Sequence, residues 1–341
     1  MRGKRKILVV RVGRAGDLVM ITPALNALLA ALPAAEIHLL TSAEGARVMR
    51  DYHPRLTRMW IYSRRFPRSL LMKSALTRAF VREGYERIYV LETKAAYGKW
   101  LRQVPGKIFA LPPDEPQGHY CDRCLDVVQG SLDDLCPRGW VHLPVTAAGR
   151  KKARELLEEN GVDPAAVLVG LHPTFSGSRL PLFRKRRDLG HRNWPPGHFA
   201  RLGDLLRQQA RARGREVAVV IDALPEEKPL VEPIIEAAGG AVTLLSGPPD
   251  FQRFKGLLEA MDVLVTPNTG PMHIAAAVGT PVVALFSRWA AEDCGPYTDP
   301  DRRVILRAED TPDPGAGLAA ITPEQAAAAV WDLLDRRANP Q

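Results

Sequence analysis

Cysteine is scarce in this sequence, and long apolar runs are absent. The chain has four cysteines among 341 residues, too few for a disulfide framework, and a reducing compartment fits this usage. No run of about 18 apolar residues occurs, so the sequence predicts no helix that crosses a membrane. The first residues are basic and Arg11 interrupts their apolar run, so we predict no signal peptide and a cytoplasmic protein.

Several well-defined catalytic motifs are missing as well. The sequence contains no G-x-G-x-x-G dinucleotide fingerprint, no Walker A loop, no H-E-x-x-H and no G-x-S-x-G. These absences argue against a dinucleotide enzyme, a P-loop enzyme, a metalloprotease and an α/β-hydrolase. Zinc-finger spacing, an RNP-like aromatic motif and a basic recognition helix are also lacking, so we expect no nucleic-acid partner.

Two short patterns could suggest a metal. Cys121 and Cys124 have the spacing of a zinc-ligand pair, but beyond Cys136 a site would need His119 as its fourth ligand. We interpret these cysteines as plain thiols. Asp299-Pro300-Asp301 has the D-x-D spacing of some transferase metal sites but lies in a proline-containing segment, which indicates a turn. We therefore expect no metal and no cofactor.

Positively charged residues outnumber negatively charged ones, and they are unevenly distributed along the chain. The net charge is +9: residues 1–107 carry 21 Lys and Arg against 7 Asp and Glu, or +14, and residues 108–341 carry 26 against 31, or −5. A basic first third predicts a polyanionic partner, such as nucleic acid, an anionic membrane surface or a phosphorylated substrate. A well-solvated surface in an arginine-rich protein remains the alternative.

Apolar segments of strand and helix periodicity alternate along the chain. With 46% hydrophobic and 25% charged residues the chain is an ordinary globular protein, and its length suggests two domains. We predict strands at 6–12, 36–41, 59–62, 87–92, 107–111, 166–171, 217–221, 242–245, 262–266 and 281–286. We predict helices at 18–32, 43–50, 120–135, 148–160, 196–212, 226–238, 251–261, 270–278 and 322–337.

This alternation predicts an α/β protein with two doubly wound parallel sheets in tandem and a cleft between the domains. We assign the first domain to 1–155 and the second to 156–341. The final helix, 322–337, is a candidate to pack back on the first domain.

Glycines mark the junction between the first strand and the first helix. Gly13 and Gly16 allow the backbone to approach a ligand closely, and the helix start favours an anion. Asp17 follows directly, where it could act as a helix cap or as a carboxylate that removes a proton from a substrate.

Two further strand ends carry polar residues in the second half. The segment Thr266–His273 closes an apolar strand and opens a helix of small residues, whose free N–H groups suit phosphate oxygens. His273 could contact a ligand or be a buried, hydrogen-bonded histidine. The segment His172–Ser178 also follows a strand, and basic residues come after it at 184–187 and at Arg192. Hydroxyl and guanidinium groups there could hold a diphosphate, although a solvated loop explains residues 184–187 equally well.

Three segments together resemble one enzyme family. The opening segment KILVVRVGRAGDLVMITPALNALLAALPAAEIHLLT, the segment HRNWPPGHFARL and the segment VLVTPNTGPMHIAAAVGTPVVALFS are similar to motifs of the ADP-heptose:lipopolysaccharide heptosyltransferases, glycosyltransferase family 9. They occur in the family's order and spacing. The resemblance implies a GT-B fold, in which two Rossmann-like domains face each other across a cleft. The acceptor binds to the N-terminal domain and the nucleotide-sugar to the C-terminal one.

The resemblance also implies an activity and a set of site residues. It implies inverting, metal-independent transfer of a heptose or related sugar from an ADP-sugar to the inner core of lipopolysaccharide, with peripheral contact at the inner face of the inner membrane. Asp17 matches the general base. The donor-side residues we expect are Arg192, Asn268, Thr269, Gly270, Pro271, Met272, His273, Thr174 and Ser176. The acceptor-side residues we expect are Gly13, Arg14, Gly16, Arg64 and Arg65.

The sequence departs from the family pattern at three places. Arg192 stands where the family has Lys, and Asn268 stands where it has Asp. Residues 222–226 read DALPE, where the family often has a Gly-Gly pair. These departures motivate an alternative: a paralogue that binds a nucleotide-sugar with altered donor preference or without transferase activity.

Overall fold

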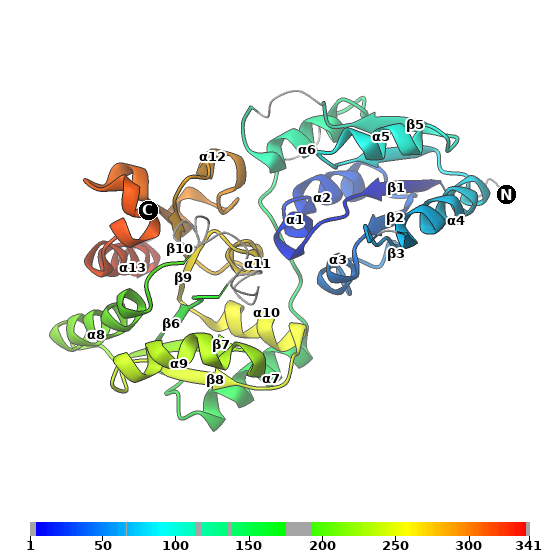
Figure 1. The fold of residues 1–341 in the computed structure, drawn as a ribbon. Coiled ribbons are helices and arrows are strands. Elements are labelled where there is room, and N and C mark those ends of the chain that lie inside the picture. The colour runs from blue at the N-terminus through cyan, green and yellow to red at the C-terminus, as the bar shows by residue number, and fades with distance from the viewer. Residues whose placement is uncertain (1–4, 66, 113–116, 136–137, 175–192, 339–341) are drawn as a thin grey trace. The chain divides into compact units, whose positions relative to one another are not determined.

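The chain folds into two α/β units (Figure 1). The computed structural model describes residues 5–65, 67–112, 117–135, 138–174 and 193–338. The predicted Ser176 and Arg192, Cys136 and the basic run at 184–187 lie outside these ranges. In the described ranges, none of the helices combines the length and the apolar composition needed to cross a membrane.

The first unit, residues 1–144, is built on a five-stranded parallel sheet. Its elements are β1 (Lys6–Val10), α1 (Ala15–Val19), α2 (Thr22–Ala31), β2 (Glu36–Thr41), α3 (Ala43–Val48), β3 (Leu56–Ile61), α4 (Arg68–Glu83), β4 (Arg87–Val90), α5 (Ala95–Leu101), β5 (Lys107–Ala110) and α6 (Tyr120–Gln129). The strand order is β3-β2-β1-β4-β5. Leu8 and Val10 point from β1 into the core that α4 and α5 cover, and because side chains alternate along a strand, Ile7 and Val9 are buried on the opposite face.

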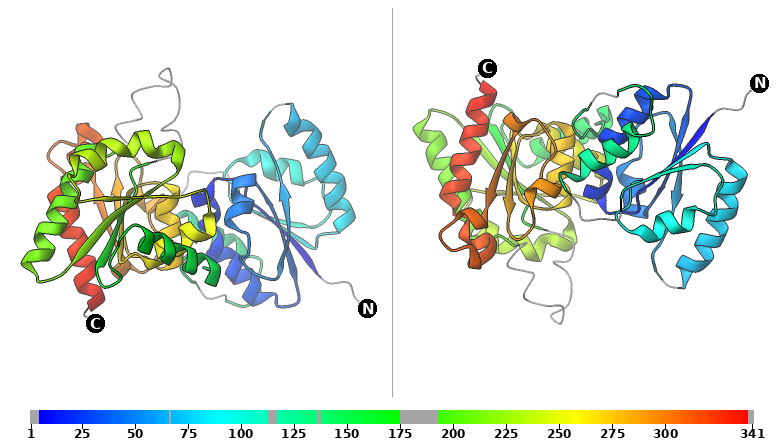
Figure 2. Two further views of the ribbon diagram at one scale, coloured as in Figure 1. Left: turned by 90° about the horizontal axis from the view of Figure 1, so that it is seen from below. Right: turned by 90° about the horizontal axis from the view of Figure 1, so that it is seen from above.

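The second unit, residues 145–341, is built on a six-stranded parallel sheet. Its elements are α7 (Ala147–Glu159), β6 (Val167–Leu171), α8 (Pro196–Ala212), β7 (Val217–Ala223), α9 (Lys228–Ala237), β8 (Thr243–Ser246), α10 (Phe251–Ala260), β9 (Val263–Pro267), α11 (Gly270–Val278), β10 (Val282–Phe286), α12 (Ala291–Cys294), β11 (Arg303–Arg307) and α13 (Pro323–Ala338). The strand order is β11-β10-β9-β6-β7-β8. Figure 2 shows helices on both faces of each sheet.

Both sheets follow the same topological rule. In each, the first strand in the chain is central, the second and third lie to one side, and the fourth and fifth lie to the other. This is the Rossmann order, and it confirms the predicted class of two Rossmann-like α/β units. The order reverses between β1 and β4 in the first unit and between β6 and β9 in the second. Ligands of such sheets bind beyond the carboxyl ends of the strands at these two positions.

The division between the units falls at Pro144 and Val145, earlier than the predicted 155 and 156. The reason is α7, which packs closely on α10 of the second unit. A Cβ built at Gly149 would lie 2.5 Å from the carbonyl oxygen of Gln252, and one built at Gly256 would lie 2.5 Å from the carbonyl oxygen of Gly149. Two glycines therefore let these helices touch through their backbones, which places α7 in the second unit.

The final helix supplies core residues to the second unit. Ala326, Ala327, Val330 and Leu334 of α13 are buried in the cluster that also contains residues of β6, β7, β9 and β10. The apolar face of α13 thus packs on the sheet of the unit to which this helix belongs.

Most other elements are confirmed within a few residues, with two corrections near the ends of the first unit's chain. The predicted helix 18–32 is two helices, α1 and α2, because Pro23 lies in the first turn of α2. The predicted helix 120–135 ends at Gln129. The structure adds α4, α5, α12 and β11, for which no element was predicted.

Candidate functional site

The loop after β1 places Asp17 at the reversal of the first sheet. One oxygen of its carboxylate, Oδ1, accepts a hydrogen bond from Nη2 of Arg11 at 2.6 Å. The other, Oδ2, accepts one from the backbone N–H of Arg14 at 2.8 Å. The Asp17 side chain is 33% exposed, so it is held on two sides and still reaches solvent.

Glycine is required beside this carboxylate. A Cβ built at Gly13 would lie 2.4 Å from the Cβ of Asp17 and 2.6 Å from its Oδ2, closer than real Cβ atoms approach. The Asp17 side chain therefore lies directly over the backbone of Gly13. The sequence predicted a close approach of a ligand at this glycine, and in the structure the group that approaches it closely is the Asp17 side chain. Gly16 is buried in the first turn of α1.

A second acid, Glu92, lies beneath this loop, two residues beyond β4. Its side chain is only 2% exposed, and its Oε1 accepts a hydrogen bond from the backbone N–H of Val12 at 2.5 Å. Nη1 of Arg11 lies 3.7 Å from its Oε2. Burial raises the pKa of Glu92, although Arg11 and the Val12 N–H act against this rise.

Arg11 links the two acids from a buried position. Its side chain is 8% exposed, and its guanidinium carbon lies 4.6 Å from the centroid of the Tyr120 ring. Burial by itself would lower the pKa of Arg11, but Tyr120, Asp17 and Glu92 together raise it above its ordinary value. The guanidinium is therefore a fixed positive charge between two carboxylates.

Arg64 joins the same network from the end of β3. Its Nη2 donates to the carbonyl oxygen of Val12 and lies 3.4 Å from Oε1 of Glu92, and its Nε donates to the Tyr97 hydroxyl at 3.0 Å. The predicted acceptor-side residues Gly13, Arg14, Gly16 and Arg64 thus gather around Asp17's loop. Arg65 is exposed beside them, and no contact of its side chain with this network is observed among the described residues.

Three residues of this network, Arg11, Glu92 and Tyr120, were not predicted from the sequence motifs. A signal for the first two was present: each is the first charged residue after an apolar strand, in ILVVR and in IYVLE. Tyr120 carried no such signal, since its place under Arg11 depends on how α6 packs on the sheet.

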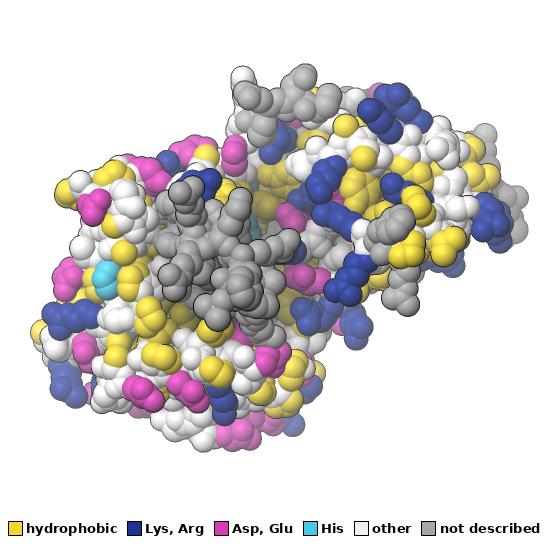
Figure 3. Space-filling model, in the orientation of Figure 1, with side chains coloured by type: hydrophobic (Ala, Val, Ile, Leu, Met, Phe, Trp, Pro, Cys, Tyr) yellow, Lys and Arg dark blue, Asp and Glu magenta, His cyan; other side chains and the backbone are white. Residues whose placement is uncertain are grey.

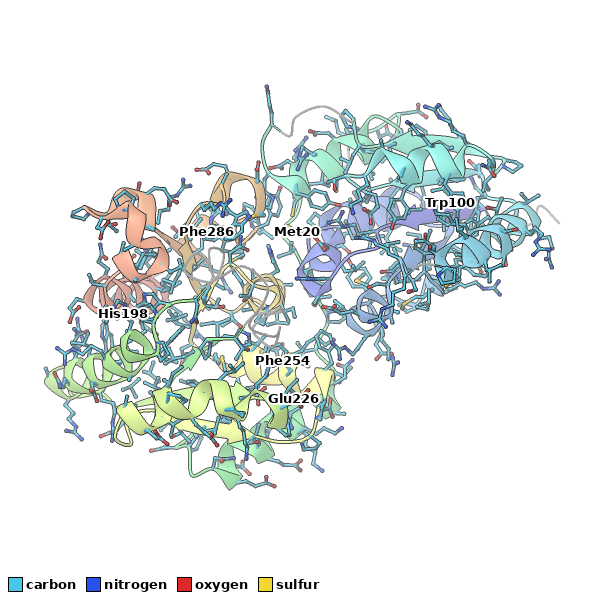
Figure 4. The ribbon with its side chains drawn as sticks, viewed as in Figure 1. Met20, Trp100, His198, Glu226, Phe254 and Phe286 are labelled. Carbon is cyan, nitrogen blue, oxygen red and sulfur yellow. The ribbon has the colours of Figure 1, made fainter. Side chains whose placement is uncertain are left out.

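In the second unit, neutral polar side chains follow β6 and β9, the two strands between which the strand order reverses. After β6, the Thr174 hydroxyl lies 3.3 Å from Nε2 of His172. Burial lowers the pKa of His172 to about 4, although the hydrogen bond at Thr174 acts in the opposite direction. The imidazole is therefore uncharged near neutral pH. Phe254 of α10, labelled in Figure 4, has its ring centroid 6.4 Å from that of His172.

The loop after β9 starts α11. Thr269 is the residue before the helix, and its hydroxyl lies 3.1 Å from that of Thr266 rather than capping the helix itself. The side-chain amide of Asn268 donates a hydrogen bond to the sulfur of Cys294, with Nδ2 3.4 Å from Sγ. Gly270 and Pro271 form the first turn of α11 and are partly exposed, whereas Met272 and His273 are buried.

These two strand ends are neighbours. The N–H of His172 donates to the carbonyl oxygen of Val265 at 3.0 Å, so the β6 and β9 ends run side by side. Thr174 and the start of α11 thus follow neighbouring strands, and the prediction that they share one ligand site stays a prediction. A helix N-terminus with hydroxyl groups beside it can bind phosphate oxygens.

Among the described residues, Cys121, Cys124 and the D-x-D pattern are not grouped as metal ligands. Cys121 and Cys124 are buried thiols in α6, and burial raises the pKa of Cys124 to about 12. Asp299 caps a short 3-10 turn by accepting from the N–H of Asp301 at 3.0 Å, which confirms the turn. Over the ranges that the structure covers, no three His, Cys, Asp or Glu side chains are grouped as metal ligands.

Comparisons with known proteins support the resemblance seen in the sequence. Residues 184–317 match the model of glycosyltransferase family 9 (heptosyltransferase). The lipopolysaccharide core heptosyltransferase OpsX of Haemophilus influenzae is 27% identical over 101 residues, which are 29% of this chain and 29% of that protein. The similarity to this curated relative thus spans less than a third of its length.

Solved structures extend the likeness to nearly the whole chain. A glycosyl transferase family 9 protein from Veillonella parvula has a TM-score of 0.79 at 19% identity, with 97% of each chain covered. The E. coli heptosyltransferase WaaC, solved with ADP, has a TM-score of 0.71 at 16% identity, covering 96% of this chain and 99% of that one. The match to the family model thus supports the resemblance over residues 184–317, and the solved structures confirm the expected GT-B fold.

Proposed function

We propose that this protein is an inverting glycosyltransferase that moves a heptose, or a related sugar, from an ADP-sugar to the inner core of lipopolysaccharide. The observation that carries the proposal is the carboxylate of Asp17, held by Arg11 and the Arg14 N–H at the sheet reversal of the first unit. This acid belongs to the segment that resembles the family's opening motif. The second unit offers the diphosphate-binding features expected for a donor.

Asp17 acts as the general base in this proposal. The acceptor hydroxyl gives its proton to the carboxylate while its oxygen forms a bond to the anomeric carbon of the donor sugar. The bond from that carbon to the diphosphate breaks on the opposite side, which inverts the configuration. The base must be ionised to accept a proton, and the buried guanidinium of Arg11, 2.6 Å away, favours the ionised form.

The departing ADP develops negative charge that must be stabilised. We assign this role to the N-terminus of α11, to the hydroxyls of Thr174 and Thr269, and to Arg192 and Ser176, which lie outside the described residues. Asn268, Gly270, Pro271, Met272 and His273 complete the donor side by their positions in the motif. Oriented N–H groups and a guanidinium can stabilise this charge, so the proposed transfer needs no metal.

The acceptor and the place of action follow from charge. Residues 1–107 carry a net charge of +14, with 21 Lys and Arg against 7 Asp and Glu, and Arg64 donates to the carbonyl oxygen of Val12 in the loop before the base. A phosphorylated, anionic glycolipid suits this unit. We therefore propose a cytoplasmic protein that works peripherally at the inner face of the inner membrane.

One observation favours a second candidate, a nucleotide-sugar-binding paralogue with altered donor preference or no transfer. Asn268 presents an uncharged amide, directed at Cys294, where family members have a carboxylate. Titration with ADP-heptose and ADP-mannose, followed by assays for product, separates the two candidates. Binding of either donor without product on any lipopolysaccharide acceptor would favour the second.

The decisive experiment replaces Asp17 by Asn and measures transfer from ADP-heptose to a lipopolysaccharide inner-core acceptor. Loss of a general base is expected to lower kcat by about 10²–10⁴-fold, while thermal stabilisation by ADP stays unchanged because the donor binds the other unit. Asp126→Asn is the matched control, since Asp126 is a surface acid of the same unit with a 60% exposed side chain. Equal rates for the wild type and Asp17→Asn would refute the proposed base.

A further inference from the structure

The solvent face of α4 carries two adjacent exposed leucines. Leu70 is 60% exposed and Leu71 is 75% exposed, at the first turn of a helix whose opposite side buries Leu76 and Phe80 in the core. Single exposed apolar residues are common in folded proteins, but two neighbouring leucines on one helix face mark a contact surface.

Helix periodicity continues this face toward the end of α4. Leu71, Ala75, Arg78 and Arg82 follow one another at spacings of three and four residues, and all four are exposed. Val81, in the adjacent row with Leu70, is 47% exposed. The face therefore combines an apolar first turn with cationic side chains further along.

The chain around α4 is free of acidic residues over a long stretch. Residues 52–82 contain eight Lys or Arg and no Asp or Glu. The acid that ends this stretch, Glu83, is 15% exposed and forms ion pairs with Lys6 and Arg58. Figure 3 shows hydrophobic side chains beside Lys and Arg side chains in the region where Figure 1 places α4.

We propose that this face of α4, which we define as Leu70, Leu71, Ala75, Arg78, Val81 and Arg82, docks on an anionic lipid bilayer. The leucines enter the boundary between headgroups and acyl chains, and the arginines meet the lipid phosphates. A helix with leucines on a face that is otherwise basic has the composition of an interfacial helix, and a negatively charged leaflet attracts such a basic segment. Charge complementarity favours a bilayer over an apolar protein partner.

The inference rests on the proposed function in one respect: an acceptor anchored in a bilayer is what makes a membrane the partner. Beyond the proposed function, the inference identifies α4 as the helix that contacts the membrane. Docking requires neither donor nor acceptor, so its test is independent of sugar transfer.

Cosedimentation with vesicles tests the proposal directly. Full-length protein is mixed with vesicles of phosphatidylcholine alone or of phosphatidylcholine with phosphatidylglycerol, at low and high salt. We expect binding to the anionic vesicles that weakens with salt, and little binding to the neutral ones. Burial of a leucine is worth about a tenfold change in partitioning, so Leu70→Ser with Leu71→Ser should lower vesicle affinity at least about tenfold.

Two further variants separate apolar from electrostatic contact. Arg78→Glu with Arg82→Glu should remove the preference for anionic vesicles. Leu135→Ser is the matched control, because Leu135 lies in the same unit and is 90% exposed but outside α4; it should bind as the wild type does. Thermal unfolding of each variant shows that the fold is retained.

Three results would overturn the proposal. Wild-type protein could fail to bind anionic vesicles, or the Leu70 and Leu71 variant could bind them as well as the wild type. Alternatively, the same variant could convert a dimer into a monomer in sedimentation velocity with no change in vesicle binding, which would assign this face to a second copy of the chain. None of these results would bear on the Asp17→Asn assay, so the two proposals can fail separately.

Discussion

The reversal points of the two sheets occupy the same topological position but are built from different groups. In the first unit, Arg11 bridges Asp17 and Glu92 in a largely buried ionic network. In the second, a neutral His172, the hydroxyls of Thr174 and Thr269, and the start of α11 take the corresponding place. The comparison teaches that one topology can hold a network of charged side chains in one unit and neutral polar groups beside a helix start in the other, as the proposed base and the proposed diphosphate site require. A base needs a fixed countercharge, whereas a diphosphate needs donors without competing carboxylates.

The largest loss of stability is expected from a substitution that breaks the ionic network of the first unit. Arg11→Met removes the buried guanidinium between Asp17 and Glu92, and Arg64 and the Val12 N–H compensate the buried charge of Glu92 only in part. This change should lower the free energy of unfolding by about 3–5 kcal/mol. Urea unfolding at pH 7 measures the change. Adding Glu92→Leu should recover most of the loss, because the poorly compensated charge is then gone.

The control for this prediction is Arg138→Met, which removes an exposed arginine paired with Asp122 and Asp126 and should cost less than about 1 kcal/mol. If Arg11→Met were as mild as this control, the network would be a surface feature and the contrast between the two units would disappear.

The next prediction concerns Asp222, a largely buried acid of the second unit in β7, the strand that pairs with β6. Burial raises the pKa of Asp222, at the end of β7, to about 6; Arg253, 3.6 Å away, opposes the rise, and Glu227 adds to it. Because the folded carboxyl binds its proton more tightly than the unfolded one, stability falls as pH rises from about 4 to about 6. The loss amounts to roughly 3 kcal/mol for a shift of about two pKa units.

Asp222→Asn should remove this fall, so the difference in unfolding free energy between variant and wild type should grow across that pH window. Urea unfolding in buffers from pH 4 to pH 7 measures it. Asp301→Asn, at an exposed acid of the same unit, serves as the control. A wild-type curve parallel to that of Asp222→Asn would show that burial does not raise the pKa of this carboxyl.

A smaller effect is expected at the glycine below the base. Gly13→Ala places a Cβ against the Asp17 side chain, so the carboxylate must move away from the Arg14 N–H. We expect a stability loss of about 1–3 kcal/mol and a lower transfer rate. Gly98→Ala in α5 has open space around it and should instead stabilise by up to about 1 kcal/mol. If Gly13→Ala transferred sugar at the wild-type rate, the position of the Asp17 carboxylate over Gly13 would not matter for its proposed role as the base.

The smallest effect belongs to the second unit. Thr269→Val keeps the side-chain shape but removes the hydroxyl pair with Thr266, which should cost about 1 kcal/mol of stability. It should also weaken ADP binding several-fold, as calorimetry can measure. A variant that bound ADP as the wild type does would place the diphosphate away from this hydroxyl.

The sequence predicted the layout of the sheets better than the composition of the sites. Apolar strands such as 6–10 and 263–267 can be predicted from the sequence because buried parallel strands are continuous apolar runs. Helix α4 was not identified, since its leucines at 70 and 71 point to solvent and disturb the apolar stripe that signals a helix.

At the site, short-range features were predictable and long-range ones were not. Gly13, Gly16 and Asp17 are close in sequence, and so are Asn268 to His273. Glu92 meets Val12 across 80 positions of the chain, and only the pairing of β1 with β4 brings them together. The same holds for the place of α13, which the periodicity of its own residues does not determine.

The place of α13 has a consequence for the order of synthesis. The second sheet begins with β6 at residue 167, yet part of the apolar layer over it comes from residues 323–338. A growing chain can complete the first unit once residue 144 has emerged from the ribosome, whereas the second must wait until its final helix has been made. Until then, part of the apolar surface of β6 and β9 stays uncovered, so we expect the nascent second unit to be the stage of synthesis most exposed to aggregation.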